Sequence, residues 1–259
     1  MEQPYVLRSD EGGVATLTLN RGERFNPLSE EMMAALQAAF KDIAQDEGVR
    51  VVVLAAAGKA FCAGHDLKQM VQTPEAEYYK TLFQQCSKLM LQVQQLPQPV
   101  IARVQGVATA AGCQLVAMCD LAVAAVEARF AVSGVNVGLF CSTPAVALSR
   151  NVPRKQAMEM LLTGDFIDAQ TALQRGLVNR VVAAEELDVE VARLVASILA
   201  KPAVAIAMGK QLFYKQLEMG ITAGYQLAGQ TMACNMMEET AQEGVQAFVE
   251  KRAPGWKKI

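Results

Sequence analysis

Two segments that each contain an Ala-Gly pair follow an apolar, strand-like run and lead into a helix. The first runs from Phe61 to Lys68 and the second from Gly106 to Leu115. Small residues let backbone N–H groups approach a bound carbonyl, and the first amides of a helix are unpaired and carry partial positive charge. Two such donors directed at one oxygen stabilise negative charge on it. The pair therefore predicts an α/β fold in which two strand-to-helix junctions form an oxyanion hole.

The rest of the chain repeats strands and helices. Strands are expected at 14–19, 51–55 and 100–104, where β-branched residues gather, and the second of these is apolar enough to be buried on both faces. Helices are expected from Ser29, an N-cap followed by two acidic residues, to about Ala44, and from Glu75 to about Leu96. Beyond Lys155 the pattern is almost wholly helical, with a short exception at 177–182. By pattern alone the chain is mixed α/β.

Composition limits the class of protein. The chain has 259 residues, of which 52% are hydrophobic and 19% charged, as expected of one compact domain with at most a helical appendage. A net charge of -2 argues against a nucleic-acid partner. The longest apolar run, Gly106 to Cys119, is interrupted by Gln114 and is too short to span a bilayer, so a buried helix and no membrane are expected. The first residues lack a basic or Arg-rich leader, which predicts a cytoplasmic protein.

Metal chemistry is not expected. The six cysteines form no C-x-x-C pair and sit mostly in apolar runs, which indicates reduced core thiols. His65 is the single histidine and has no cluster of acidic or cysteine residues around it at ligand spacing. No metal and no separate cofactor are predicted.

The order and spacing of many segments resemble the crotonase superfamily, which contains the enoyl-CoA hydratases and isomerases. The resemblance implies a ClpP-like spiral of ββα units over residues 1–195 and a C-terminal helical trimerisation region over 196–259. It further implies a homotrimer or a dimer of trimers. The many Met residues between Met208 and Met237 suit such a packed surface between subunits, and ordinary core packing explains them equally well. The matching segments are residues 20–28, 61–68, 106–115, 118–121, 136–139, 162–164, 169, 172, 176–178 and 247–252.

The resemblance also assigns site residues. The backbone amides of His65 and Ala111 match the oxyanion donors of the family, while the ordinary alternative is that Gly64 and Gly112 only permit tight turns and close packing. Coenzyme A enters only as part of an acyl-CoA thioester substrate, with Phe248 and Lys251 reaching it from another subunit. Arg24, Lys68, Phe248 and Lys251 each also have an ordinary explanation, as solvated charges or as residues that pack helices. The residues implied to contact it are Arg24, Ala63, His65, Asp66, Leu67, Lys68, Phe248 and Lys251.

Both carboxylates of a proficient hydratase are missing by this resemblance, because Gln114 and Gly134 stand at their positions. Water addition needs a base for the water and an acid for the α carbon, and an amide or a glycine supplies neither. The Gln114 amide is expected to face the oxyanion donors, or else to be a buried group satisfied by backbone. Ser133, Asn136 and Cys141 are expected around the missing second carboxylate.

Three functions remain open. The first is an acyl-CoA-binding protein of hydratase/isomerase type that stabilises a thioester enolate but hydrates weakly. The second is a decarboxylase of malonyl-type thioesters, in which His65 and Gln114 orient the carboxylate that leaves; a lone histidine is more often structural. The third is an acyl-CoA binder or scaffold without catalysis.

Overall fold

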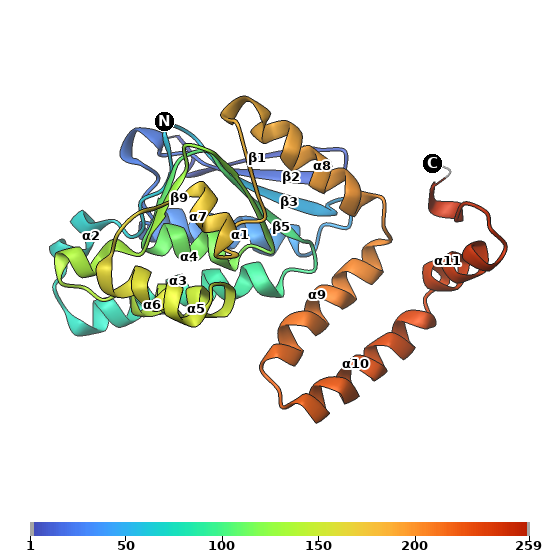
Figure 1. The fold of residues 1–259 in the computed structure, drawn as a ribbon. Coiled ribbons are helices and arrows are strands. Elements are labelled where there is room, and N and C mark those ends of the chain that lie inside the picture. The colour runs from blue at the N-terminus through green and yellow to red at the C-terminus, as the bar shows by residue number, and fades with distance from the viewer. Residues whose placement is uncertain (1–2, 258–259) are drawn as a thin grey trace.

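The computed structural model describes residues 3–257, which form a core of two sheets covered by helices and a helical extension (Figure 1). The strands are β1 Val6–Glu11, β2 Val14–Leu19, β3 Val51–Ala56, β4 Ala60–Cys62, β5 Val100–Val104, β6 Val107–Thr109, β7 Leu121–Ala125, β8 Arg129–Ala131, β9 Ile167–Asp168 and β10 Arg180–Val182. The helices are α1 Glu30–Ile43, α2 Leu67–Gln72, α3 Ala76–Gln95, α4 Ala111–Met118, α5 Ser142–Asn151, α6 Arg154–Thr163, α7 Ala169–Gln174, α8 Leu187–Leu199, α9 Ala203–Leu217, α10 Ile221–Met236 and α11 Glu239–Val249.

The larger sheet has the order β1-β2-β3-β5-β7-β10 and is parallel except for the β1–β2 hairpin. The smaller sheet has the order β4-β6-β8-β9. From β3 onward, a strand of the larger sheet is followed by a short strand of the smaller sheet and then by a helix, as in β5-β6-α4 and β7-β8-α5. This is the predicted ββα repeat.

Strand β3 is buried on both faces, as its unbroken apolar run predicts. Val51 and Val53 belong to a cluster with Leu187 and Val191 of α8 on one face of the sheet. The alternate residues of β3 belong to the main core on the other face, which α1 and α3 cover. Because successive side chains of a strand point to opposite faces, a strand between two helical layers has no polar position.

The smaller sheet corrects one expectation. The apolar run from Gly106 to Cys119 is not a single buried helix, because Val107–Thr109 form β6 and only Ala111–Met118 are helical. Gly106 explains how β6 fits in place: a Cβ built on it would lie 1.9 Å from the carbonyl oxygen of Lys59. The absence of a side chain lets the two backbones pass in contact.

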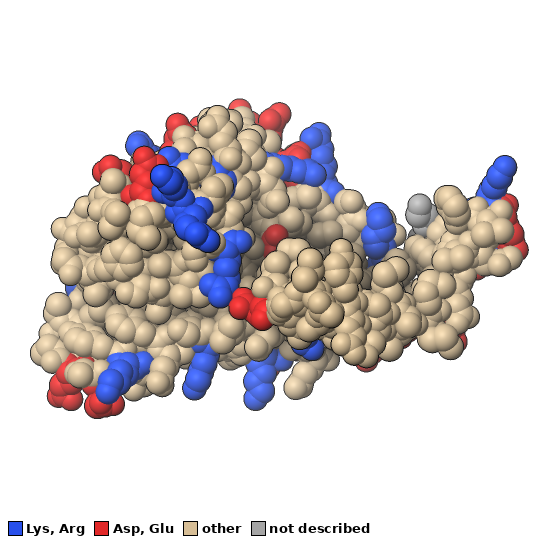
Figure 2. All heavy atoms as spheres, turned by 60° about the horizontal axis from the view of Figure 1, so that its bottom comes forward, with Lys and Arg blue, Asp and Glu red and all other residues tan. Residues whose placement is uncertain are grey.

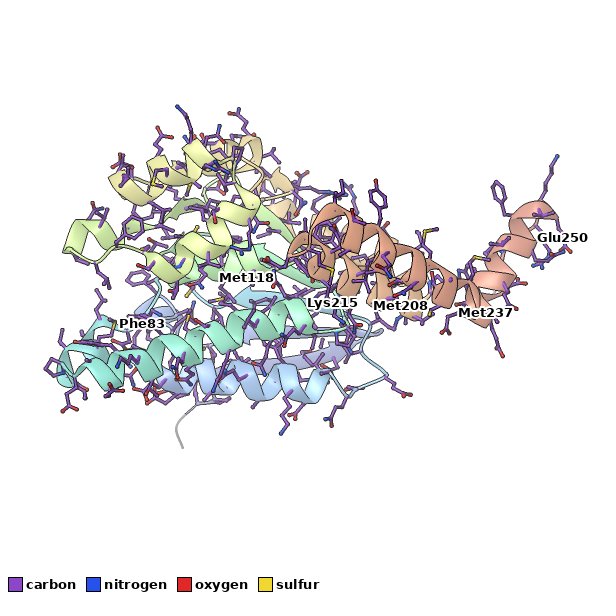
Figure 3. The ribbon with its side chains drawn as sticks, turned by 90° about the horizontal axis from the view of Figure 1, so that it is seen from below. Phe83, Met118, Met208, Lys215, Met237 and Glu250 are labelled. Atoms are coloured by element: carbon purple, nitrogen blue, oxygen red, sulfur yellow. The ribbon has the colours of Figure 1, made fainter. Side chains whose placement is uncertain are left out.

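Helices α9 to α11 and the turn after them form an extension, here called the arm (residues 203–257), that leaves the core (Figure 1). The expected boundary at 195/196 falls inside α8, whose residues Leu187, Val191 and Val195 pack on the sheet, so the chain leaves the core only after α8. Figure 3 shows α9 and α10 projecting from the core, with Met208, Lys215 and Met237 along them. Many large apolar side chains of the arm are exposed, among them Phe213, Ile221, Tyr225, Met237 and Phe248.

A buried ion pair joins the arm to the core. Lys210 of α9 donates from Nζ to Asp120 Oδ2 at 2.6 Å and to the carbonyl oxygens of Val93 and Gln98 at 2.9 and 3.0 Å. Tyr214, one turn further along α9, donates to the other carboxylate oxygen of Asp120 at 2.9 Å. Burial lowers the pKa of Lys210, and the neighbouring Asp120 opposes that shift. The cluster fixes α9 where the chain turns away from the sheet.

The surface carries charges of both signs without a large single-sign patch on the face that Figure 2 presents. Basic and acidic side chains are interspersed there over the core, and much of the arm is uncharged. No single described helix has both the length and the apolar character of a membrane span; only the bent pair Ala184–Leu199 and Ala203–Leu217, at 103°, meets these criteria together. Among residues 3–257, no group of three or more His, Cys, Asp or Glu side chains is arranged to hold a metal ion.

Candidate active site

A cavity of about 300 Å³ opens where the two predicted strand-to-helix junctions meet. Its wall is mostly apolar. Five of the residues that the sequence analysis assigned to the site contribute to the wall, namely Ala63, His65, Leu67, Ala111 and Gly134. The other lining residues are Met70, Phe83, Ala110, Ser133, Val137, Leu139, Phe140, Cys141, Ser142, Thr143 and Pro144.

The first junction connects β4 to α2. Gly64 has a φ of +88°, in the region that favours glycine, and its carbonyl accepts from the Leu28 amide at 2.7 Å. Asp66 then caps α2, because its carboxylate accepts from the backbone amides of Lys68 and Gln69. Between these two fixed points the amide of His65 has no acceptor among the described residues.

The second junction connects β6 to α4. Ala110 has φ 50° and ψ -121°, a strained conformation for a residue with a side chain, and its amide is held by the carbonyl of Ala131 at 3.0 Å. Ala111 is the first residue of α4, so its N–H has no partner within the helix. The strained residue thus turns the chain so that α4 begins with a free amide in the cavity wall.

The two junctions are in contact because both contain glycine. A Cβ built on Gly64 would lie 3.2 Å from the nitrogen of Ala111, and one built on Gly112 would lie 2.2 Å from the carbonyl oxygen of Cys62. Any side chain at Gly112 would therefore push α4 away from β4. The glycines act as close-packing residues, and this packing brings His65 and Ala111 to the wall of the same cavity.

The imidazole of His65 lies in the cavity wall. Both ring nitrogens are buried, and neither makes a hydrogen bond of normal geometry within residues 3–257. The ring packs edge-on against Phe83 of α3, with the ring centroids 5.5 Å apart. Burial lowers the pKa of His65 and the backbone of Leu28 opposes that shift, so the ring is neutral near pH 7. A neutral imidazole in this position is able to exchange a hydrogen bond with a bound group.

Of the two arrangements expected for Gln114, the structure shows the buried one. Gln114 lies on α4 and is buried, and it is not among the residues that line the cavity. Its Oε1 atom is 4.0 Å from the Sγ atom of Cys86 on α3. The side chain therefore contacts the α3–α4 packing, and the expected orientation beside the oxyanion donors is not observed.

Gly134 has no room for a side chain. A Cβ built on it would lie 2.4 Å from the carbonyl oxygen of Leu139 and 2.8 Å from the Sγ atom of Cys141. The Gly134 amide donates to that Sγ atom at 3.3 Å. The loop that follows Gly134 thus occupies the space in which a side chain at this position would begin, with the Cys141 thiol in contact.

Two other residues near Gly134 have structural partners. The hydroxyl groups of Ser133 and Thr109 are hydrogen-bonded at 2.8 Å. Asn136 donates to the carbonyl of Gly164 at 3.3 Å. Both contacts fix the turn after β8.

The residues assigned to coenzyme A are spread over the chain. Arg24 and Lys68 are exposed, and Asp66 serves as the cap of α2. Phe248, 84% exposed, and Lys251 lie at the far end of the arm, away from the cavity of the same chain. The structure therefore does not bring these two residues to the cavity within one chain.

Phe83 and Met70 are cavity residues that the sequence analysis did not assign to the site. Both lie on helices at the side of the cavity, and Figure 3 labels Phe83 on α3. The helical periodicity of residues 75–96 predicts the helix that carries Phe83. It does not indicate that Phe83, which is half-buried, faces a cavity rather than solvent.

We expect four core thiols to resist labelling in the native protein. Burial raises the pKa of Cys62, Cys86 and Cys113 to about 12, and it raises that of Cys119 as well. The thiolate is the reactive form, so at neutral pH these groups should react with a maleimide only after unfolding. Peptide mapping by mass spectrometry before and after addition of denaturant measures this. Rapid native labelling of any of the four would contradict the buried environment described here.

Comparison with known proteins identifies the class. The family model "Enoyl-CoA hydratase/isomerase" matches residues 9–258. A crystal structure of an enoyl-CoA hydratase from Mycobacterium smegmatis superposes with a TM-score of 0.97 at 64% identity, covering 98% of this chain and 100% of that one. The chain belongs to the enoyl-CoA hydratase/isomerase family and has the crotonase fold, as its sequence motifs predicted.

Within the family the chain is similar to enoyl-CoA hydratase domain-containing protein 3. The rat protein of that name is 45% identical over 94% of this chain and 81% of its own length. The human protein is 44% identical over 94% of this chain and 80% of its own length. The crystal structure of the human protein superposes with a TM-score of 0.92 at 43% identity, covering 98% of this chain and 100% of that one.

These relatives correct the expected location. The rat and human proteins are named as mitochondrial, which contradicts the prediction of a cytoplasmic protein. That prediction depended on the composition of the first few residues, and these do not determine the compartment in which a protein works.

Proposed function

We propose that the cavity binds an acyl-CoA thioester with its carbonyl oxygen between the amides of His65 and Ala111. The observation that carries this proposal is the pair of amides without acceptors at two junctions held in contact by Gly64 and Gly112. The apolar wall suits an acyl chain. Polarisation of the carbonyl stabilises the enolate form of the thioester.

We further propose that the arm packs on another copy of the chain, in a homotrimer or a dimer of trimers. Apolar side chains such as Ile221, Met237 and Phe248 are exposed along it, and so many exposed large apolar side chains on one extension are typical of an interface. In such an assembly Phe248 and Lys251 are free to contact coenzyme A in a neighbouring subunit. Their distance from the cavity of their own chain supports this assignment.

Removal of one amide tests the carbonyl site. Proline is tolerated at the first position of a helix, so Ala111→Pro deletes a single N–H without breaking a bond within α4. We expect the infrared carbonyl stretch of bound ¹³C-labelled butyryl-CoA to lie below its frequency in water for the wild type. We expect that shift to be largely lost in Ala111→Pro.

The matched control is Ala76→Pro, the same substitution at the first position of α3, where the residue is exposed. This variant should keep the carbonyl shift. Thermal unfolding of both variants establishes that they are folded. An unchanged carbonyl frequency in a folded Ala111→Pro protein would refute the role of the amide.

A second candidate function is decarboxylation of a malonyl-type thioester, which needs an enolate to be stabilised but no base. The observation that favours it is the neutral His65 imidazole in the cavity wall, whose ring nitrogens make no hydrogen bond of normal geometry within residues 3–257. Carbon dioxide release from malonyl-CoA, lost in His65→Ala, would support it. Binding of thioesters with no product across a panel would instead support a binder without catalysis.

A further inference from the structure

We propose that Cys141 forms a covalent adduct with α,β-unsaturated acyl-CoA thioesters bound in the cavity. The proposal rests on the proposed function, because the thioester must first bind between the two junctions. It adds a chemical step that replaces the addition of water by the addition of a thiol of the protein itself.

The position of the thiol carries the inference. Cys141 lines the same cavity as His65 and Ala111, and a Cβ on Gly134 would lie 2.8 Å from its Sγ atom. The thiol therefore stands against the position where the family resemblance places a carboxylate that handles water. With the thioester oxygen between the two amides as proposed, the acyl chain and the Cys141 thiol share one cavity of about 300 Å³.

The surroundings of Cys141 differ from those of the other core thiols. Its Sγ atom accepts a hydrogen bond from the Gly134 amide at 3.3 Å, which favours the thiolate, while burial raises the pKa of the thiol. Cys62 and Cys113 are fully enclosed and do not line this cavity, so a ligand bound in it does not reach them. The ring nitrogens of His65 in the same wall are buried and make no hydrogen bond of normal geometry within the described residues, which is a separate sign that this space suits a polar ligand.

The step is balanced without a further reactant. The S–H bond of Cys141 breaks, and a bond forms between Sγ and the β carbon of the enoyl group. The electron pair of the C=C bond moves to the thioester oxygen, where the His65 and Ala111 amides hold the enolate. The enolate then takes up the proton lost by the thiol at the α carbon, which leaves a saturated thioester joined to the protein by a thioether.

Intact-protein mass spectrometry after acid quench tests the proposal on the full chain. Incubation with crotonyl-CoA is expected to add the mass of one crotonyl-CoA per chain, and peptide mapping is expected to place it on Cys141. Butyryl-CoA, which lacks the double bond, is expected to give no adduct. Cys141→Ser should abolish the adduct, whereas Cys234→Ser, at an exposed cysteine of α10, should retain it.

The outcomes separate this proposal from the proposed function. Calorimetry with butyryl-CoA measures binding alone on the wild type. Binding of butyryl-CoA without a crotonyl-CoA adduct overturns the role of Cys141 and leaves the proposed function standing. An adduct that persists in a Cys141→Ser variant with wild-type thermal unfolding also overturns it, and absence of binding by both esters overturns the two proposals together.

Discussion

Crotonyl-CoA is expected to be hydrated by this protein far more slowly than by a family member that carries both carboxylates. A positioned acid or base contributes ~10²–10⁴-fold to such a rate, and both positions lack an ionisable group in Gln114 and Gly134. Loss of crotonyl-CoA absorbance, followed with a proficient hydratase as reference, measures the difference. Turnover comparable to that reference would contradict the prediction.

Restoring the carboxylates by substitution is not expected to restore the rate. In Gly134→Glu the Cβ atom would meet the carbonyl oxygen of Leu139 at 2.4 Å, so the loop must move before the carboxylate is placed. Gln114→Glu alone puts a carboxyl in the α3–α4 packing, beside Cys86, rather than in the cavity. Gly220→Ala is the matched control for adding a Cβ, because nothing lies within 4 Å of that position. Hydratase-level turnover in the double variant would show that the loop rearranges freely.

Replacement of Lys210 by methionine is expected to destabilise the protein by about 3–5 kcal/mol, the cost of removing one partner from a buried ion pair. The substitution leaves the Asp120 carboxylate buried with its Tyr214 and Val100 partners but without its counter-charge. It also leaves the carbonyl groups of Val93 and Gln98 without their donor. Urea unfolding at a fixed protein concentration measures the change.

The control for this experiment lies on the same helix. Lys215 of α9 is exposed and labelled in Figure 3. Lys215→Met is expected to change the free energy of unfolding by no more than about 0.5 kcal/mol, as surface substitutions usually do. Equal effects of the two substitutions would mean that the Lys210 cluster does not anchor the arm.

Sequence patterns predicted the bounds of the long helices and strands well, because the pattern of buried apolar residues determines where these elements form. The strand at 14–19 is observed at its expected bounds, β3 is one residue longer than expected, and Ser29 caps α1 by accepting from the Met32 amide. Helix α3 ends at Gln95, before Pro97, as expected. Strands β4, β6, β8 and β9 have only two or three residues each, which is too short for a hydrophobic period to be recognised.

The place of the cavity was predictable where the backbone forms it and less so where side chains do. Glycine positions and helix starts predicted that His65 and Ala111 lie at two neighbouring junctions, and both residues line one cavity, while their role as donors stays a prediction. The direction of the Gln114 side chain depends on packing against Cys86, a residue far away in the sequence. The crowding at Gly134 depends on the path of the loop to Cys141, which no local pattern specifies.

The strained backbone of Ala110 has a consequence for affinity. The conformation at φ 50° is held by the Ala131 carbonyl and by the contact between α4 and β4, so its cost is met when the chain folds. Under the proposed function, an incoming ester meets a junction that already has its strained conformation, so no free energy of binding is needed to form it. Selection among esters would then depend on the shape of the apolar cavity wall, because the two amides contact only the carbonyl oxygen that all of these esters share.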